Sequence, residues 1–83
     1  MPKKSYKKRG NYKVIVFDDN LNTFHHVRKS LQDICGHNYL QAIQCTSIIH
    51  NSGRCNVYTD GHDQCIDVFN ELAERGLRAS IVK

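Results

Sequence analysis

The alternation of apolar and polar positions predicts six short elements of secondary structure after residue 11. A continuous apolar run at 14–17 is too short for a helix and predicts a buried strand. A helix is expected next, with Asn22 as its N-cap and Gly36 just past its end. Its apolar residues recur at spacings of three and four, which indicates one buried face: Phe24, Val27, Leu31 and Ile34.

A second helix is expected from Asn38 to His50. Asn38, with Gln41 three residues later, matches the capping-box pattern of a helix start. Gly53 is expected to stop the chain from continuing as a helix. The inner face of this helix is predicted to comprise Ala42, Cys45 and Ile49.

The last third of the chain predicts a strand, a helix and a strand. Residues 54–58 end in Val57 and Tyr58, which favour extended structure. Asp60 is expected to cap a third helix that Gly76 ends. The buried stripe of this helix is predicted to be Ile66, Phe69, Leu72 and Ala73. In the closing segment 77–82, alternation predicts a half-buried strand with Leu77, Ala79 and Ile81 facing inward.

This order predicts an α+β fold: a two-layer sandwich of a three-stranded antiparallel sheet and three helices, in the order β-α-α-β-α-β. Eighty-three residues form one domain with a small core. A core of this size argues against an elaborate catalytic cleft, and no nucleophile stands beside a base in a recognised motif. We therefore expect a protein that is not an enzyme.

Positive charge is concentrated at the start of the chain. Five of the twelve Lys and Arg residues lie in the first ten positions, whereas residues 11–83 are nearly neutral. We predict a flexible basic arm at 1–11 and a core domain at 12–83. Such an arm is typical of a solvated leader, but it also fits a small nucleic-acid-binding module. Removing residues 1–10 separates these alternatives, because only nucleic-acid binding depends on the arm.

The apolar segments and the cysteines bear on where the protein works. No apolar run approaches the length of about 20 residues that spans a bilayer, and no signal-peptide pattern follows the basic start. The four cysteines are ten residues apart and form no C-x-x-C pair, so we expect free structural thiols, no metal and no cofactor. We predict a cytoplasmic monomer. Four of the histidines are expected to be surface residues: His25, His26, His37 and His62.

Candidate binding chemistry lies where the first strand ends. Asp18, Asp19 and Asn20 follow the strand directly and precede a helix, so they place carboxylates on a rigid strand end. Carboxylates beside an apolar hollow attract an ammonium group that carries an apolar side chain, which describes a peptide N-terminus. A polar turn explains the same three residues, and a histidine such as His50 is also favoured at a helix C-terminus by the helix dipole.

The chain resembles the ClpS family, the bacterial N-end-rule adaptors of the Clp protease, over residues 12–83. The segment YKVIVFDDN matches the family's opening strand and acidic turn. His50-Asn51-Ser52-Gly53 matches the end of a helix in a His followed three residues later by Gly. Val57 to Thr59 resembles the strand before the third helix, and Leu77 to Val82 resembles the closing strand.

The resemblance implies a non-enzymatic adaptor that recognises proteins beginning with Leu, Phe, Tyr or Trp. It delivers them to a AAA+ Clp chaperone of the ClpA or ClpC type. Asp18, Asp19 and His50 correspond to the residues that bind the α-amino group, with Asp18 replacing a family Asn. Asn20, Asn22 and Thr23 correspond to the peptide-backbone contacts. The pocket for the N-terminal side chain corresponds to Phe24, Val27, Thr46, Ile49 and Leu77.

Three replacements relative to the family pattern affect what the resemblance implies. Phe24 replaces a Met that guards the pocket and Thr46 replaces a pocket Met, so the shape of the pocket changes. Chaperone docking corresponds to Asp60 and to Cys65, which replaces a family Lys.

Overall fold

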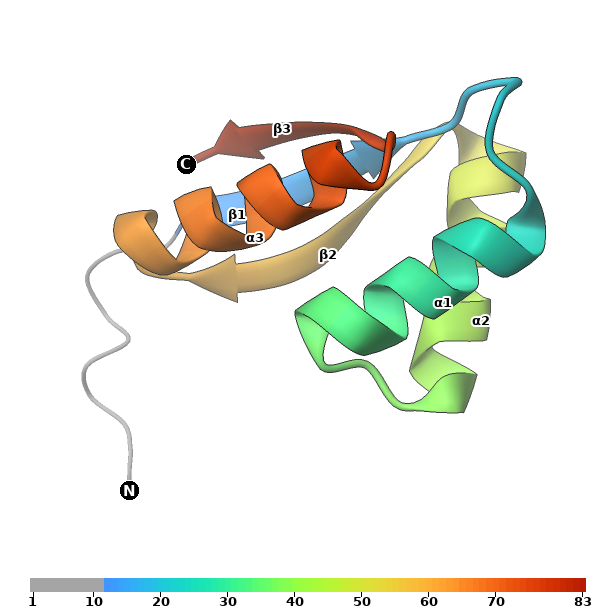
Figure 1. The fold of residues 1–83 in the computed structure, drawn as a ribbon, viewed down its shortest axis with the longest axis horizontal. Helices are drawn as coiled ribbons and strands as arrows, with labels where there is room; N and C mark the ends of the chain where they lie inside the picture. Colours follow the sequence, from blue (N-terminus) through green and yellow to red (C-terminus); the bar gives the residue numbers. More distant parts are fainter. Residues whose placement is uncertain (1–11) are drawn as a thin grey trace.

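The structure, a computed structural model, describes residues 12–83. The predicted basic arm at 1–11 lies outside these described residues, so the structure does not test it. The order of elements agrees with the prediction (Figure 1). They are β1 (Tyr12–Phe17), α1 (Phe24–Cys35), α2 (Tyr39–Ser52), β2 (Arg54–Asp60), α3 (His62–Glu74) and β3 (Arg78–Val82).

The three strands form one antiparallel sheet in the order β2-β1-β3. The central strand β1 alternates in burial, with Val14 and Val16 almost fully buried and their neighbours half-buried. Val14 and Val16 therefore point toward the helices, and Ile15 and Phe17 point toward the other face. The predicted two-layer α+β sandwich is confirmed.

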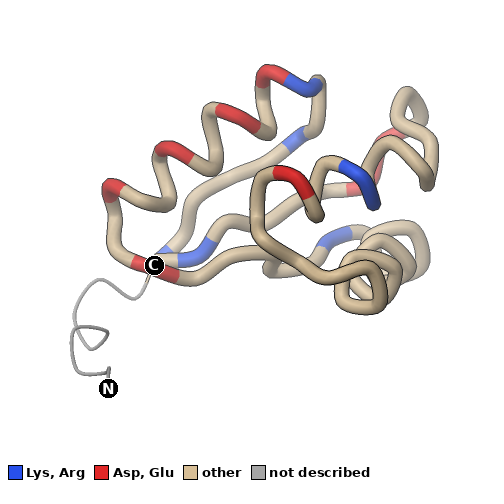
Figure 2. Tube along the Cα trace, turned by 60° about the horizontal axis from the view of Figure 1, so that its bottom comes forward, with Lys and Arg blue, Asp and Glu red and all other residues tan. Residues whose placement is uncertain are grey.

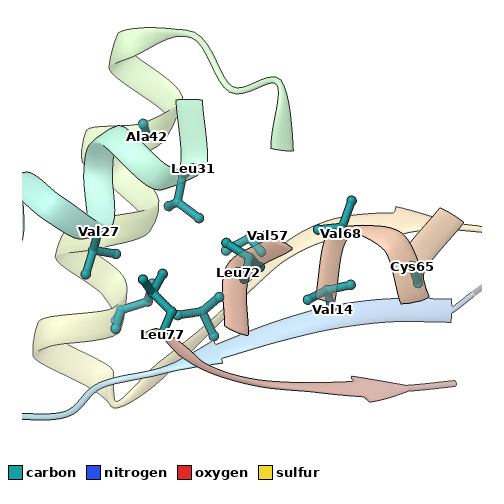
Figure 3. Close-up of a cluster of buried hydrophobic side chains, with 11 residues drawn as sticks. Val14, Val27, Leu31, Ala42, Val57, Cys65, Val68, Leu72 and Leu77 are labelled. Carbon is teal, nitrogen blue, oxygen red and sulfur yellow. The ribbon is translucent and has the colours of Figure 1, made fainter. Parts of the chain in front are cut away.

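One hydrophobic core joins all three helices to the helix side of the sheet. Figure 3 shows Val14, Val57, Val68 and Leu72 meeting where α3 crosses the strands. Leu31 and Ala42 extend the core between α1 and α2. Since Val27, Ile49 and Leu77 also belong to this cluster, the core reaches the end of the sheet where β1 stops.

The buried face of α3 differs from the prediction by one position. Cys65, Val68 and Leu72 are buried, whereas Ile66 and Phe69 are only half-buried and Ala73 is exposed. Adjacent residues lie about 100° apart on a helix, so both sets belong to one broad apolar face. The rotation of α3 against the sheet selects the first set, and a free cysteine packs there as a small hydrophobe.

Two helix starts also differ from the prediction. Thr23, not Asn22, caps α1, and its hydroxyl accepts a hydrogen bond from the backbone N–H of His26. Gly61, not Asp60, is the N-cap of α3 and has no side chain to accept a bond. The side chains of Asn22 and Asp60 have other partners, because each is engaged in its own loop.

Charge is distributed unevenly over the surface. Figure 2 shows acidic residues recurring along α3, which carries Asp63, Asp67, Glu71 and Glu74 on its outer side.

In residues 12–83 no helix combines the length and the apolar character that crossing a membrane requires.

Candidate functional site

The candidate site lies where β1 leaves the sheet and α2 ends. Nδ1 of His50 is 3.0 Å from Oδ1 of Asp18. The two side chains are 30% and 36% exposed, so both are reachable from solvent while the protein holds their positions. A carboxylate only accepts hydrogen bonds, so Nδ1 carries the proton and Nε2 of the neutral ring is left as an acceptor.

Gly53 brings these two residues together from 32 positions apart. It ends α2 with φ at 96°, a left-handed conformation that disfavours other residues, and its N–H donates to the carbonyl of Ile49. The Gly53 carbonyl then accepts a hydrogen bond from the N–H of Asp18 at 2.9 Å. The last turn of α2, which carries His50, is therefore fixed against the end of β1.

Asp19 organises the loop that follows β1. Its Oδ1 accepts hydrogen bonds from the backbone N–H groups of Leu21 and Asn22 at 2.9 and 3.0 Å. The side-chain amide of Asn22 donates to the same carboxylate and also to the carbonyl of Gly76, 3.0 Å away. Asn22 thus ties the loop to the turn between α3 and β3.

The hydrogen bonds at Asp19 keep its carboxyl ionised. Burial acts to raise the pKa of Asp19, but the backbone N–H groups of Leu21 and Asn22 and the Asn22 amide lower it more. The positive charge of Arg78 lowers it further, so the pKa lies below its ordinary value. Asp19 therefore adds a permanent negative charge beside the Asp18–His50 pair.

Phe24 covers the imidazole of His50. The two rings are stacked, with centroids 5.5 Å apart and planes 24° apart. Phe24 is the first residue of α1 and is 40% exposed, so it lies at the surface over the candidate site.

The other four residues of the predicted pocket lie in the core. Val27, Thr46, Ile49 and Leu77 are each at most 5% exposed. The Thr46 hydroxyl donates to the carbonyl of Ala42 within α2, so it presents no polar group to a ligand. In this conformation these four side chains are closed off from solvent.

The remaining predicted site residues have clear places. Asn20 is exposed in the loop after β1, and Thr23 serves as the N-cap of α1. Asp60 accepts hydrogen bonds from the Tyr58 hydroxyl and the Gly61 N–H, which occupies both carboxylate oxygens. Cys65 is fully buried, so its side chain does not form a surface to which a chaperone docks.

Two histidines predicted to be surface residues are in fact structural. Nε2 of His26 lies 2.8 Å from the carbonyl of Arg75, and both residues are half-buried. Nε2 of His37 lies 2.7 Å from the carbonyl of Val57. These partners are 49 and 20 residues away along the chain, so no local pattern signals them.

The site has no arrangement for metal binding. Within residues 12–83, no group of three or more His, Cys, Asp or Glu side chains is placed to hold an ion. Its chemistry is that of hydrogen bonding and charge: a carboxylate, an imidazole acceptor and a second carboxylate beside an aromatic ring.

Comparison with known families places the chain in a class of protein. A profile described as ATP-dependent Clp protease adaptor protein matches residues 7–80, which is most of the chain. The protein is therefore a non-catalytic adaptor that works with a Clp chaperone-protease in protein degradation. The chain belongs to the ClpS family. A comparison with curated proteins gives no match.

Proposed function

We propose that this adaptor recognises substrate proteins by their free α-amino group and a bulky apolar first residue, such as Leu, Phe, Tyr or Trp. It then delivers them to a AAA+ Clp chaperone of the ClpA or ClpC type, in the cytoplasm. The observation that carries this proposal is the Asp18–His50 pair, held at 3.0 Å beside the half-exposed ring of Phe24. Four free thiols suit a reducing compartment.

The amine is bound by charge and by directed acceptors. An α-amino group is cationic below its usual pKa of about 7.7–8.0. The Asp18 carboxylate and Nε2 of His50 each accept a hydrogen bond from it, and Asp19 adds negative charge without leaving its loop. A hydrogen bond to a charged group contributes about 1.5–3 kcal/mol. An acetylated N-terminus has no positive charge and only one N–H, so it loses most of this contribution.

The first side chain of the substrate enters beneath Phe24. Rotation of Phe24 away from His50 opens a path to the apolar side chains of Val27, Ile49 and Leu77, which belong to the buried core. Burying a Leu or Phe side chain there contributes about 1.5–3 kcal/mol. After the cost of association, these contributions support binding in the micromolar range, which lets an adaptor release its cargo.

Fluorescence anisotropy tests the proposal with two peptides that differ only at the N-terminus. Both begin with Phe and carry the label at the C-terminus, and one is N-acetylated. We expect the free peptide to bind at least about tenfold more tightly, since one charge-assisted hydrogen bond is worth about that factor. Equal affinities of the two peptides would refute amine recognition.

A further inference from the structure

The face of the sheet that the helices leave uncovered has a composition of its own. Because Val14 and Val16 point into the core, the alternate residues Lys13, Ile15 and Phe17 of β1 point outward. The strand register places one residue of β2 and one of β3 beside each of them. This open sheet face consists of Lys13, Ile15, Phe17, Arg54, Asn56, Thr59, Arg78, Ser80 and Val82.

Positive charge on the open sheet face surrounds an apolar centre. Arg54 on β2 and Arg78 on β3 flank Phe17 on either side, and the Arg78 guanidinium lies 5.8 Å from the centre of the Phe17 ring. Lys13 adds a third cation on β1, the strand that carries Phe17. None of the nine residues of this face is acidic. Its three positive charges therefore have no neutralising carboxylate on the same face.

The open sheet face is also hollowed. A concavity of about 300 Å³ is lined by Ile15, Phe17, Arg54 and Val82. Three of these side chains are apolar, and Val82 remains 41% exposed. This volume is at the lower limit of the range of about 300–1,000 Å³ typical of ligand pockets. It suits one large apolar side chain and leaves Arg54 at its rim for a carboxylate.

We infer that the open sheet face binds an acidic peptide segment of a partner protein, with one bulky apolar side chain seated in the hollow. The carboxylates of that segment pair with Arg54, Arg78 and Lys13. This surface is separate from the Asp18–His50 pair, because Ile15 and Phe17 point away from the helices. It needs no free α-amino group on the partner.

Three other occupants fit this face less well. The arm at residues 1–11 carries five Lys and Arg residues and would be repelled by this face. A single-stranded nucleic acid is favoured by several aromatic side chains that stack its bases, whereas this face has only Phe17, whose ring already meets Arg78. A second copy offering its acidic helix α3 would make a head-to-tail contact, which builds a ring or a filament in place of a closed dimer.

The test is a titration of the isotope-labelled full chain, followed by NMR. The probe is the N-acetylated, C-amidated peptide Asp-Glu-Asp-Leu-Asp-Glu-Asp, whose blocked N-terminus cannot use the amine site. We expect chemical-shift changes of the backbone amides to be concentrated in β1 and β3, around Phe17 and Val82. The affinity should fall as the salt concentration is raised. Replacing the Leu of the probe by Ala is expected to weaken binding about tenfold, as the hollow loses its apolar occupant.

A pair of charge-reversal variants locates the surface. Arg54→Glu is expected to weaken probe binding about tenfold or more, because a paired cation becomes an anion. Lys29→Glu makes the same change in charge on α1, where Lys29 pairs with Asp33 at 3.5 Å, and is expected to change affinity less than about twofold. Both variants should keep their affinity for a free Phe-starting peptide, which shows that they are folded.

Several results would overturn the inference. Shifts confined to α3 or to the Asp18–His50 site, or equal affinities of Arg54→Glu and Lys29→Glu, would place the probe elsewhere. Tighter binding of an oligothymidine to this face would identify a nucleic-acid surface instead. Concentration-dependent self-association that Arg54→Glu abolishes would identify a second copy as the occupant.

Discussion

The ring of Phe24 stacks on the ring of His50, so the first residue of α1 covers the imidazole on the last turn of α2. These residues are 26 positions apart, and their contact places an aromatic side chain over the imidazole of the candidate amine site. Phe24 is 40% exposed, and the loop before it is held by Asp19 and Asn22. The backbone is therefore fixed while the ring faces solvent, which suits a residue that controls access to the candidate amine site.

Phe24→Ala should change which first residues bind. Removing the ring leaves more space over Val27 and Ile49, so the affinity for a Trp-starting peptide relative to a Leu-starting one should rise up to about tenfold. The free energy of unfolding should fall by only about 1 kcal/mol, since the ring is half-exposed. Anisotropy with the two peptides and urea unfolding measure these effects. An unchanged ratio would show that Phe24 does not shape the pocket.

Replacements of Asp18 should separate its charge from its hydrogen bonding. Asp18→Ala removes the acceptor and should weaken binding of a free Phe-starting peptide about tenfold or more. Asp18→Asn keeps a carbonyl oxygen at the same place and should weaken it less. Neither change should affect the N-acetylated peptide. The idea fails if Asp18→Ala and the parent chain bind the free peptide equally well.

Acidification should weaken binding through His50. A proton added to the imidazole turns Nε2 from an acceptor into a donor and adds a positive charge beside the ammonium. The imidazolium also pairs with Asp18 at 3.0 Å and competes for its carboxylate. Affinity for the free peptide should therefore fall from about pH 7.5 to about pH 5.5.

A matched pair of histidine variants assigns this pH dependence. His50→Gln keeps a neutral side chain across the range and should flatten the profile. His62→Gln, at the start of α3 beside the Tyr12 ring, should leave the slope of the parent chain intact. A steep profile in His50→Gln would assign the titration to another group.

The thiol of Cys35 should reduce stability in alkaline solution. Burial raises its pKa from 9.0 to about 12, and burial likewise raises the pKa of Tyr58 to about 12. Above pH 9.0 and below about pH 12, the unfolded chain has lost the Cys35 thiol proton that the folded chain retains. The stability of the folded chain therefore falls as pH rises. Cys35→Ala should therefore show a smaller fall in Tm between about pH 8.5 and pH 10.5 than the parent chain. Parallel Tm curves would contradict this assignment.

Local sequence was sufficient to predict the helices and strands and most of the residues at which they begin and end. The capping box of Asn38 and Gln41 forms as the sequence predicts, and Gly36 and Gly53 end their helices in left-handed conformations. It was not sufficient at the start of α1, where Asn22 and Thr23 are both good caps. There the side chain of Asn22 is held by the Asp19 carboxylate and by the carbonyl of Gly76, 54 residues away, and Thr23 accepts the capping hydrogen bond instead.

The candidate site shows the same division. The polar residues after β1 and the histidine near the end of α2 stand out in the sequence, but their spacing does not say that they meet. In the sequence, only the resemblance to the ClpS family relates them to one site. The stack of Phe24 on His50 and the burial of the polar Thr46 had no local signal, whereas the alternation at 77–82 predicted that Leu77 faces inward.

The sequence by itself determined the six elements, their order and the placement of carboxylates at the end of β1, because apolar periodicity and capping chemistry act within a few residues. Tertiary structure decided which face of α3 is buried, that His26 and His37 are held by distant carbonyls, and that Asp18 meets His50. These outcomes depend on how the helices lie on the sheet and on the hydrogen bond from the N–H of Asp18 to the carbonyl of Gly53, and both join residues that are far apart in the chain.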